Sequence, residues 1–385
     1  MTNEYNRCLS CAKPSCKSAC PVNNDIPQFL RLVKQGDYAA AVGIIGHPFG
    51  EICGYVCPHD KQCQGGCVLN KRGAPVKVGE VERDVFALNP YKVERTSNAL
   101  DGMKIAVVGG GVCGVTFAVK TYERGADVTV YEGDKLLSTL RLIPPFRLPV
   151  DAIERVETAL NGKINVVNKT VDGEHLRRLE RDYDVVLVSV GASVNYGLGV
   201  DGAELAIDCK DCLQGNFTGK NVVIVGGGNS AMDCARLINS RGGRATVAYR
   251  RTVNDMPAFA KEIEQAMREN VKFICNVAPV KLERANGCLA LLLAKTVSEG
   301  RGKLTITDEL STLTCDCVVT AIGSGFDDSV LGGRGKNTEN YHQFGNVFLG
   351  GDAKRGKLVA DAVADGLRIA DLITENKGKI CSSTK

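Results

Sequence analysis

The sequence predicts an α/β protein in which two nucleotide-binding units follow a cysteine-rich N-terminal segment. Three observations lead to this fold class. Two tight groups of cysteines lie between residues 8 and 67, two glycine-rich turns each follow a short apolar strand, and a helical stretch and a second strand follow each turn. A length of 385 residues is enough for two or three domains.

The N-terminal segment carries the cysteine groups. The first group is Cys8, Cys11, Cys16 and Cys20, followed by Pro21, and the second is Cys53, Cys57, Cys63 and Cys67, with Pro58 after Cys57. Thiolates at this density, with Cys-Pro pairs, are typical of iron–sulfur clusters. Two other interpretations are tetrahedral zinc and a disulfide framework, the second of which belongs to small secreted domains. The nucleotide-binding units that follow favour clusters.

The overall composition narrows the class of partner. A net charge of +4, with no tryptophan and few other aromatic residues, argues against a nucleic-acid partner. The start of the chain is polar, and its longest apolar runs have only the length of a strand. We therefore expect no membrane association and a cytoplasmic protein whose cysteines serve metal or redox chemistry.

The first nucleotide-binding unit begins with an expected strand at 104–108. The turn Gly109-Gly-Gly111-Val-Cys-Gly114, a helix over 115–124 and a strand over 128–131 that ends on Glu132 come next. Glycines of this G-x-G-x-x-G pattern let backbone N–H groups approach a pyrophosphate at a helix N-terminus. An acid at the position of Glu132 accepts hydrogen bonds from a ribose 2′-hydroxyl. The unit thus predicts a site for an adenosine dinucleotide such as FAD or NAD.

The second unit repeats this order. An expected strand at 221–225 leads to the turn Gly226-Gly-Gly228-Asn229-Ser230-Ala231, a helix over 232–240 and a strand over 244–249 that ends on Arg250 and Arg251. Two guanidinium groups in place of the acid suit a 2′-phosphate, which predicts NADPH as the ligand. The alternative is that both arginines only solvate the end of a strand. Two such units in one chain predict two Rossmann-like domains.

A further glycine turn lies near the C-terminus. A short apolar strand over 346–349 leads to Gly350-Gly351-Asp352, and a helical pattern runs from 357 to 373. In flavoproteins with two dinucleotide sites, such a Gly-Asp pair lets the carboxylate contact the ribityl chain of the flavin. Asp352 alone would fit a simple turn, but beside two nucleotide units we predict that Gly351 and Asp352 contact FAD.

Together these motifs resemble the small (beta) subunit of glutamate synthase and its relatives, which include the N-terminal half of dihydropyrimidine dehydrogenase. The most specific stretches are 8–21, 51–59, 143–149, 226–233 and 249–257. The resemblance implies a helical double [4Fe-4S] domain over 1–100, an FAD domain over 101–200 and 325–385, and an NADPH domain inserted over 201–324. It implies an NADPH-dependent oxidoreductase that passes electrons through FAD and the clusters to a partner subunit or a ferredoxin-like protein.

The resemblance also implies the cluster ligands. One cluster would be held by Cys8, Cys11, Cys16 and Cys67, and the other by Cys20, Cys57 and Cys63 with a fourth ligand from a following helix. Glu82 occupies that place, and Cys53 is the competing candidate.

Two features depart from this pattern. The segment from Glu132 to Pro144 is shorter than in relatives and lacks their glycines, which leaves open a cluster-containing scaffold with an altered flavin site. Cys209 and Cys212 form a C-x-x-C just before the second unit, where thioredoxin reductases carry their redox-active pair. A thioredoxin-reductase-like disulfide reductase is therefore the rival function.

Overall fold

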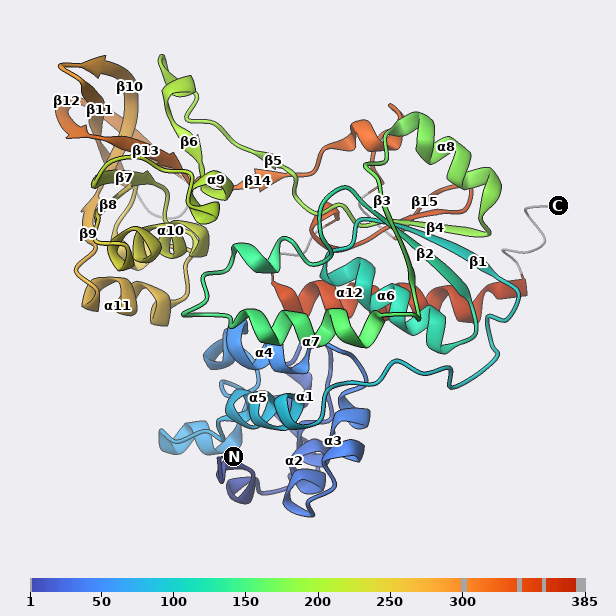
Figure 1. Cartoon of the computed structure of the whole chain (residues 1–385). Helices are drawn as coiled ribbons and strands as arrows, with labels where there is room; N and C mark the ends of the chain where they lie inside the picture. Colours follow the sequence, from blue (N-terminus) through green and yellow to red (C-terminus); the bar gives the residue numbers. More distant parts are fainter. Residues whose placement is uncertain (1, 299–302, 338–340, 355–357, 379–385) are drawn as a thin grey trace. The chain divides into compact units, whose positions relative to one another are not determined.

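The computed structural model describes residues 2–298, 303–337, 341–354 and 358–378 (Figure 1). The chain forms two compact units. Unit 1 contains Met1–Arg141, Pro145–Ser193 and Phe326–Lys385, and unit 2 contains Leu142–Pro144 and Val194–Gly325. The expected cluster domain and the expected FAD domain lie together in unit 1, so the division into three domains remains a prediction.

The N-terminal part of unit 1 is helical, as the resemblance implies. Its helices are α1 (Ser15–Ser18), α2 (Ile26–Lys34), α3 (Tyr38–Ile45), α4 (Gly50–Val56) and α5 (Val78–Leu88). The side chains of Asp25 and Asp37 accept hydrogen bonds from the first turns of α2 and α3 and so fix where these helices begin. Apolar faces of α2, α3 and α5 enclose a core that contains Phe29 and Phe86, and several of the clustered cysteines pack against it.

The rest of unit 1 is built on a six-stranded sheet. In spatial order its strands are β15 (His342–Phe344), β16 (Val347–Leu349), β4 (Val185–Val188), β1 (Lys104–Val108), β2 (Asp127–Glu132) and β3 (Asn165–Asn168). All neighbours are parallel except β15 and β16. Four helices accompany the sheet: α6 (Val112–Glu123), α7 (Val150–Leu160), α8 (Gly173–Asp182) and α12 (Val359–Glu375). Helix α12 packs along α6 (Figure 1).

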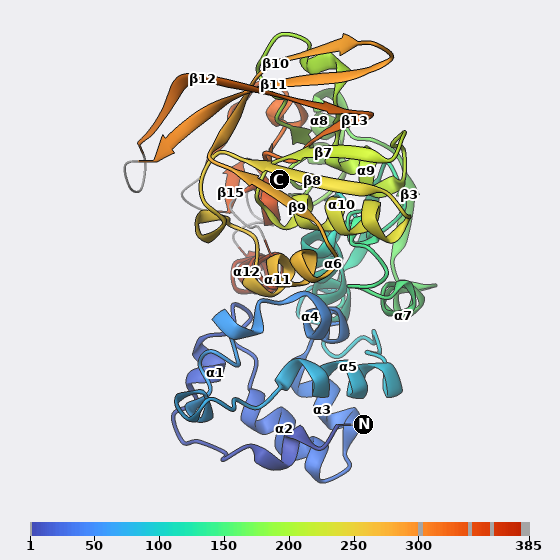
Figure 2. The ribbon, with the colours of Figure 1, turned by 90° about the vertical axis from the view of Figure 1, so that its left-hand side faces the viewer.

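Unit 2 combines a parallel and an antiparallel sheet. The parallel sheet has the order β6 (Ile207–Asp208), β13 (Cys317–Thr320), β7 (Asn221–Val225), β8 (Arg244–Tyr249) and β9 (Lys272–Cys275). Its helices are α9 (Cys209–Gln214), α10 (Asn229–Ser240) and α11 (Ala260–Arg268). Strands β10 (Val277–Ala285), β11 (Cys288–Ser298) and β12 (Leu304–Cys315) form the antiparallel sheet (Figure 2). Leucines of β10 and β11 pack onto Val223 and Val225 of the parallel sheet.

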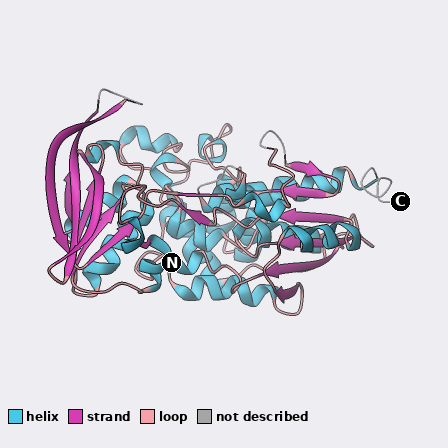
Figure 3. Ribbon diagram, turned by 90° about the horizontal axis from the view of Figure 1, so that it is seen from above, coloured by secondary structure: helices cyan, strands magenta, loops and turns pink. Residues whose placement is uncertain are grey.

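The long segment of unit 2, Val194–Gly325, begins and ends in one short strand pair. Strand β5 (Val194–Asn195) pairs antiparallel with β14 (Ser324–Gly325), and the register joins Asn195 to Ser324 and Val194 to Gly325. The strands of the larger sheets stand out in Figure 3. No helix in the described ranges has the length and apolar character needed to span a membrane.

The elements around both glycine turns follow the sequence prediction. The strands at 104–108, 221–225 and 244–249 have the predicted bounds, whereas α6 and α10 begin three residues earlier than predicted, because each helix starts directly after the middle glycine of its turn. Of the C-terminal helical pattern, residue 357 lies outside the described residues, and α12 begins at Val359. The antiparallel sheet β10–β12 was not predicted.

Candidate cofactor and cluster sites

The first glycine turn has the geometry of a dinucleotide site. Gly109 has φ +101°, and a Cβ there would lie 2.6 Å from the carbonyl oxygen of Ser189. A Cβ on Gly114 would lie 2.1 Å from the carbonyl oxygen of Gly109, so α6 packs too closely for any side chain at this position. A Cβ on Gly111, in contrast, would meet no atom within 4 Å. This open side is where a pyrophosphate can approach the start of α6.

Glu132 lies at the end of β2, beside this turn. Its Oε2 accepts a hydrogen bond from the backbone N–H of Gly110 at 2.6 Å, and its Oε1 accepts one from Asp134 at 2.9 Å. The shortened segment that follows folds back onto the turn, because Leu137 is buried with φ +55° and its N–H donates to the carbonyl oxygen of Gly110 at 2.9 Å. The carboxylate therefore stays beside the first glycine turn, at the end of β2, although the following glycines are missing.

The C-terminal turn lies beside the first one. Gly351 has φ +68°, and a Cβ there would lie 2.9 Å from the Cβ of Cys113, which belongs to the first turn. The N–H of Gly351 donates to Asp365 Oδ2 at 3.1 Å, and the hydroxyl of Tyr341 donates to Asp365 Oδ1 at 2.7 Å. Asp352 follows and is exposed. The residues predicted to contact FAD thus gather at the carboxyl edge of one sheet, and the buried Asp365, which the sequence did not single out, fixes the turn.

The second glycine turn repeats the geometry of the first. Gly226 has φ +146°, a Cβ on it would lie 2.2 Å from the carbonyl oxygen of Ala321, and a Cβ on Gly228 would meet no atom within 4 Å. Asn229 Oδ1 accepts the backbone N–H of Phe259 at 2.9 Å and so holds the segment after β8 against the turn. Ala231 at the third position is fully buried, and Ser230 beside it is exposed.

Arg250 and Arg251 follow directly after β8. Arg250 is exposed and Arg251 is half-buried. Within the described ranges, neither guanidinium group makes a hydrogen bond or an ion pair. Both side chains are therefore available to an anionic ligand at the end of this strand.

The first set of predicted cluster ligands lies on the surface of the helical part. Cys8, Cys11, Cys16 and Cys67 are all half-buried. Burial, followed by the neighbouring Cys67 and Cys8, raises the pKa of Cys16 to about 11. The two segments that carry them also touch elsewhere, since a Cβ on Gly66 would lie 2.7 Å from the carbonyl oxygen of Ser15.

The second set lines a pocket inside unit 1. Its wall contains Cys20, Cys53, Cys57, Cys63 and Glu82, together with Ala360 from the second residue of α12. Glu82 is 5% exposed and makes no hydrogen bond or ion pair with any described residue, and burial raises its pKa to about 8. A buried carboxylate of this kind needs a charged or metal partner. Cys53 also lines the pocket, and a hydrogen bond with Cys57, and then burial, raise its pKa.

The described residues of the two sets contain no site for a single metal ion. Among the residues that the structure describes, no three cysteine, histidine or acidic side chains converge on one point. In an iron–sulfur cluster each thiolate binds a different iron, so its ligands surround a volume instead of converging. Cys20, Cys57, Cys63 and Glu82 line one pocket, as the ligands of such a cluster would.

The C-x-x-C pair is built into the core of unit 2. Cys212 on α9 is 0% exposed and forms a hydrogen bond with Cys234 on α10, which is the main cause that raises the pKa of Cys234. Burial, followed by the neighbouring Asp208, raises the pKa of Cys209. Thiol–disulfide exchange requires an accessible thiolate. This arrangement therefore disfavours the pair as a disulfide-reducing centre.

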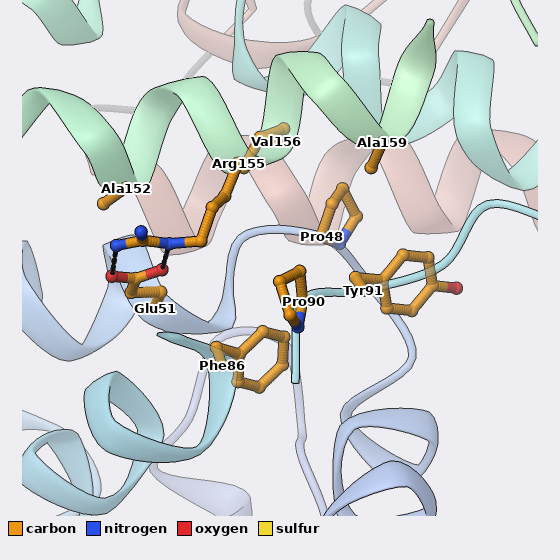
Figure 4. A pocket seen from close by; sticks show the side chains of 9 residues that line it. All are labelled: Pro48, Glu51, Phe86, Pro90, Tyr91, Ala152, Arg155, Val156 and Ala159. Atoms are coloured by element: carbon orange, nitrogen blue, oxygen red, sulfur yellow. Dashed lines mark hydrogen bonds and ion pairs between the residues drawn. The ribbon is translucent and has the colours of Figure 1, made fainter. Parts of the chain in front are cut away.

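An ion pair that the sequence did not indicate joins the helical part to α7. Figure 4 shows the guanidinium group of Arg155 facing the carboxylate of Glu51, with Nε to Oε2 at 2.8 Å and Nη2 to Oε1 at 2.6 Å. The pocket beside this pair is lined by Phe86, Pro90 and Tyr91 on one side and by α7 on the other. The pair fixes α4, which precedes Cys57, against the sheet domain.

Comparison with known proteins gives matches over nearly the whole chain. Residues 1–92 match the family model "Dihydropyrimidine dehydrogenase domain II, 4Fe-4S cluster", and residues 103–366 match "Pyridine nucleotide-disulphide oxidoreductase". The chain is 30% identical to the glutamate synthase [NADPH] small chain of Escherichia coli, over 96% of this chain and 89% of that protein. It is also 30% identical to the NADP(+)-dependent formate dehydrogenase subunit beta of Moorella thermoacetica, over 92% of this chain and 59% of that protein.

Solved structures resemble the fold at lower identity. Mycobacterium tuberculosis FprA in complex with NADPH has a TM-score of 0.59 at 18% identity, over 73% of this chain and 85% of that one. Lactococcus lactis thioredoxin reductase has a TM-score of 0.58 at 16% identity, over 73% of this chain and 99% of that one. At these identities the likeness concerns the arrangement of the nucleotide-binding domains alone.

Proposed function

Since the chain belongs to the family of the glutamate synthase small chain, an NADPH-dependent oxidoreductase family with an iron–sulfur domain, we propose that it carries electrons between NADPH and a protein partner through FAD and two [4Fe-4S] clusters. The first turn with Glu132 and the Gly351-Asp352 turn would hold FAD, and the second turn with Arg250 and Arg251 would hold NADPH. FAD, when bound, accepts a hydride from NADPH and releases its two electrons singly.

The observation that carries the proposal is the pocket of Cys20, Cys57, Cys63 and Glu82 beside the start of α12. Helix α12 follows the Gly351-Asp352 turn in the chain, with residues 355–357 outside the described part. A cluster in this pocket would therefore lie between the predicted flavin site and the surface set of Cys8, Cys11, Cys16 and Cys67. This order provides a short route for single electrons from the flavin to the surface.

The reaction needs a partner, for which the relatives suggest two kinds. A glutamate synthase small chain implies a large subunit, and the Moorella relative is named as one subunit of a formate dehydrogenase. We propose that this chain likewise delivers electrons to, or receives them from, a partner subunit or a ferredoxin-like carrier.

The test is the content and spectrum of the protein purified without oxygen. We expect bound flavin and about eight irons with as many acid-labile sulfides per chain, as two four-iron clusters require. Cys67→Ser should damage one cluster and Cys63→Ser the other, as resolved by electron paramagnetic resonance of the reduced protein, while Cys288→Ser outside both sets is the matched control. Stoichiometric zinc without sulfide would overturn the proposal.

The cluster signals of two further variants identify the eighth ligand, and reduction assays test the rival function. Glu82→Ala should alter the signal of one cluster, whereas Cys53→Ala should leave both unchanged, and the reverse result would assign the ligand role to Cys53. Replacing Cys209 and Cys212 by serine should leave NADPH-dependent reduction of a one-electron dye intact. Reduction of a protein disulfide that depends on these two cysteines would replace the proposed function.

A further inference from the structure

We infer that the surface around the first cysteine set is the docking site of an acidic one-electron carrier protein; this inference rests on the proposed function. The surface, here called the cluster rim, consists of residues 7–20 and 66–75. It contains Cys8, Cys11, Cys16 and Cys67, all of which are half-buried.

The two segments of the rim form one continuous surface. Arg7 Nη2 donates to the carbonyl oxygen of Ala74 at 2.5 Å, and Arg7 Nη1 donates to that of Pro75 at 3.3 Å. A Cβ on Gly66 would lie 2.9 Å from the Cβ of Ala19. The segments therefore touch at both ends, and Cys16 and Cys67 lie between these contacts along the chain.

The charge of the rim has a single sign. Its charged residues are all basic, namely Arg7, Lys13, Lys17, Lys71 and Arg72. Arg7 pairs with Glu4 and Lys17 pairs with Asp25. Lys13, Lys71 and Arg72 are exposed and form no ion pair with a described residue. The rim thus presents three unpaired positive charges around a predicted redox centre.

Exposed apolar side chains stand directly beside the predicted ligands. Leu9 follows Cys8 and is 62% exposed, and Val68 follows Cys67 and is 41% exposed. Electron-transfer partners use small interfaces, in which a few apolar contacts bring the centres together and charges steer the encounter. A basic ring around Leu9 and Val68 fits a carrier with an acidic surface around its own redox group, because opposite charges raise the association rate.

The test uses an acidic bacterial ferredoxin as the probe and the complete holoprotein. Two photoreduced ferredoxins give one electron each, so that NADP⁺ and a proton form NADPH, whose absorbance reports the rate. Lys71→Glu with Arg72→Glu should lower this rate at least about tenfold at low ionic strength, since steering contributes about 10- to 1,000-fold. In about 1 M salt, where the Debye length is about 3 Å, the loss should shrink to about twofold.

Three comparisons make the result specific. The control pair Lys163→Glu with Arg181→Glu changes the net charge by the same amount at exposed positions outside the rim. Its rate of NADPH formation should stay within about twofold of the rate of the unmodified protein. Lys71→Arg with Arg72→Lys keeps both charges and should retain the rate. The reduction of a basic carrier such as cytochrome c by NADPH through the protein should be faster with the Lys71→Glu, Arg72→Glu variant than with the unmodified protein.

Each outcome separates the docking site from the proposed function. Equal losses in the rim and control pairs, or no loss in the rim pair, would overturn the docking site. A holoprotein that reduces a neutral dye with NADPH but takes no electrons from the ferredoxin would also overturn it and leave the proposed function intact. A holoprotein that does neither would overturn both.

Discussion

The strongest effect on stability should come from Arg155, which neutralises a buried carboxylate between the helical part and α7. The side chain of Glu51 is 4% exposed, and both of its oxygens accept hydrogen bonds from Arg155. In Arg155→Met the carboxylate stays buried without a partner. Breaking a buried pair in this way costs about 3–5 kcal/mol of the free energy of unfolding.

The structure favours the lower end of this range. The side chain of Arg155 is itself 28% exposed, so water can reach Glu51 once the guanidinium group is gone. We therefore expect a loss of about 3 kcal/mol. For a domain of this size, that corresponds to a fall of about 6–12 °C in the melting temperature of unit 1.

Thermal and denaturant unfolding of the holoprotein provide the assay. The control is Arg178→Met, which removes an exposed ion pair with Glu174 and should cost less than about 1 kcal/mol. Glu51→Gln combined with Arg155→Met removes the stranded charge and should recover much of the loss. If Arg155→Met were as stable as Arg178→Met, or the double variant no better than the single one, the account of a buried charge would be wrong.

Three further changes test other parts of the chain. Arg250→Gln with Arg251→Gln should weaken NADPH binding about ten- to a hundredfold and leave NADH nearly unchanged in steady-state kinetics, because a charge-assisted contact contributes about 1.5–3 kcal/mol; equal use of both nucleotides by the unmodified protein would contradict this. His47 is wholly buried, and burial, with Lys120 nearby, lowers its pKa to about 3. The folded state therefore binds fewer protons than the unfolded state below the ordinary histidine pKa. Between pH 7 and pH 5, the free energy of unfolding measured in urea should fall by about 2 kcal/mol more in the unmodified protein than in His47→Gln. Parallel pH profiles of the two proteins would refute this. Asp365→Ala frees the N–H of Gly351 and should raise the dissociation constant of FAD about tenfold or more, measured by flavin fluorescence on dilution, whereas unchanged retention would show that the turn holds without it.

Short-range patterns in the sequence predicted the nucleotide-binding units because strand, turn and helix are neighbours in the chain. The antiparallel sheet escaped prediction, since in β12 the alternation of Leu304 and Ile306 with threonines is interrupted at Asp308 and most of the strand is polar. Contacts between distant segments were also inaccessible. Nothing in the local sequence pairs Glu51 with Arg155, and nothing near Cys212 shows that Cys234 covers it.

The pairing of β5 with β14 bears on how such a protein can change its nucleotide. Val194 and Gly325 are partners across one strand pair, so a segment of more than a hundred residues leaves the host sheet and returns at a single point. Directly opposed residues of antiparallel strands lie about 5 Å apart, a gap that many inserted folds can bridge. Recombination at these two positions would exchange as one unit the segment that carries the second glycine turn. Relatives could then differ in the coenzyme that they use, while the six-stranded sheet that carries the first glycine turn stays unchanged.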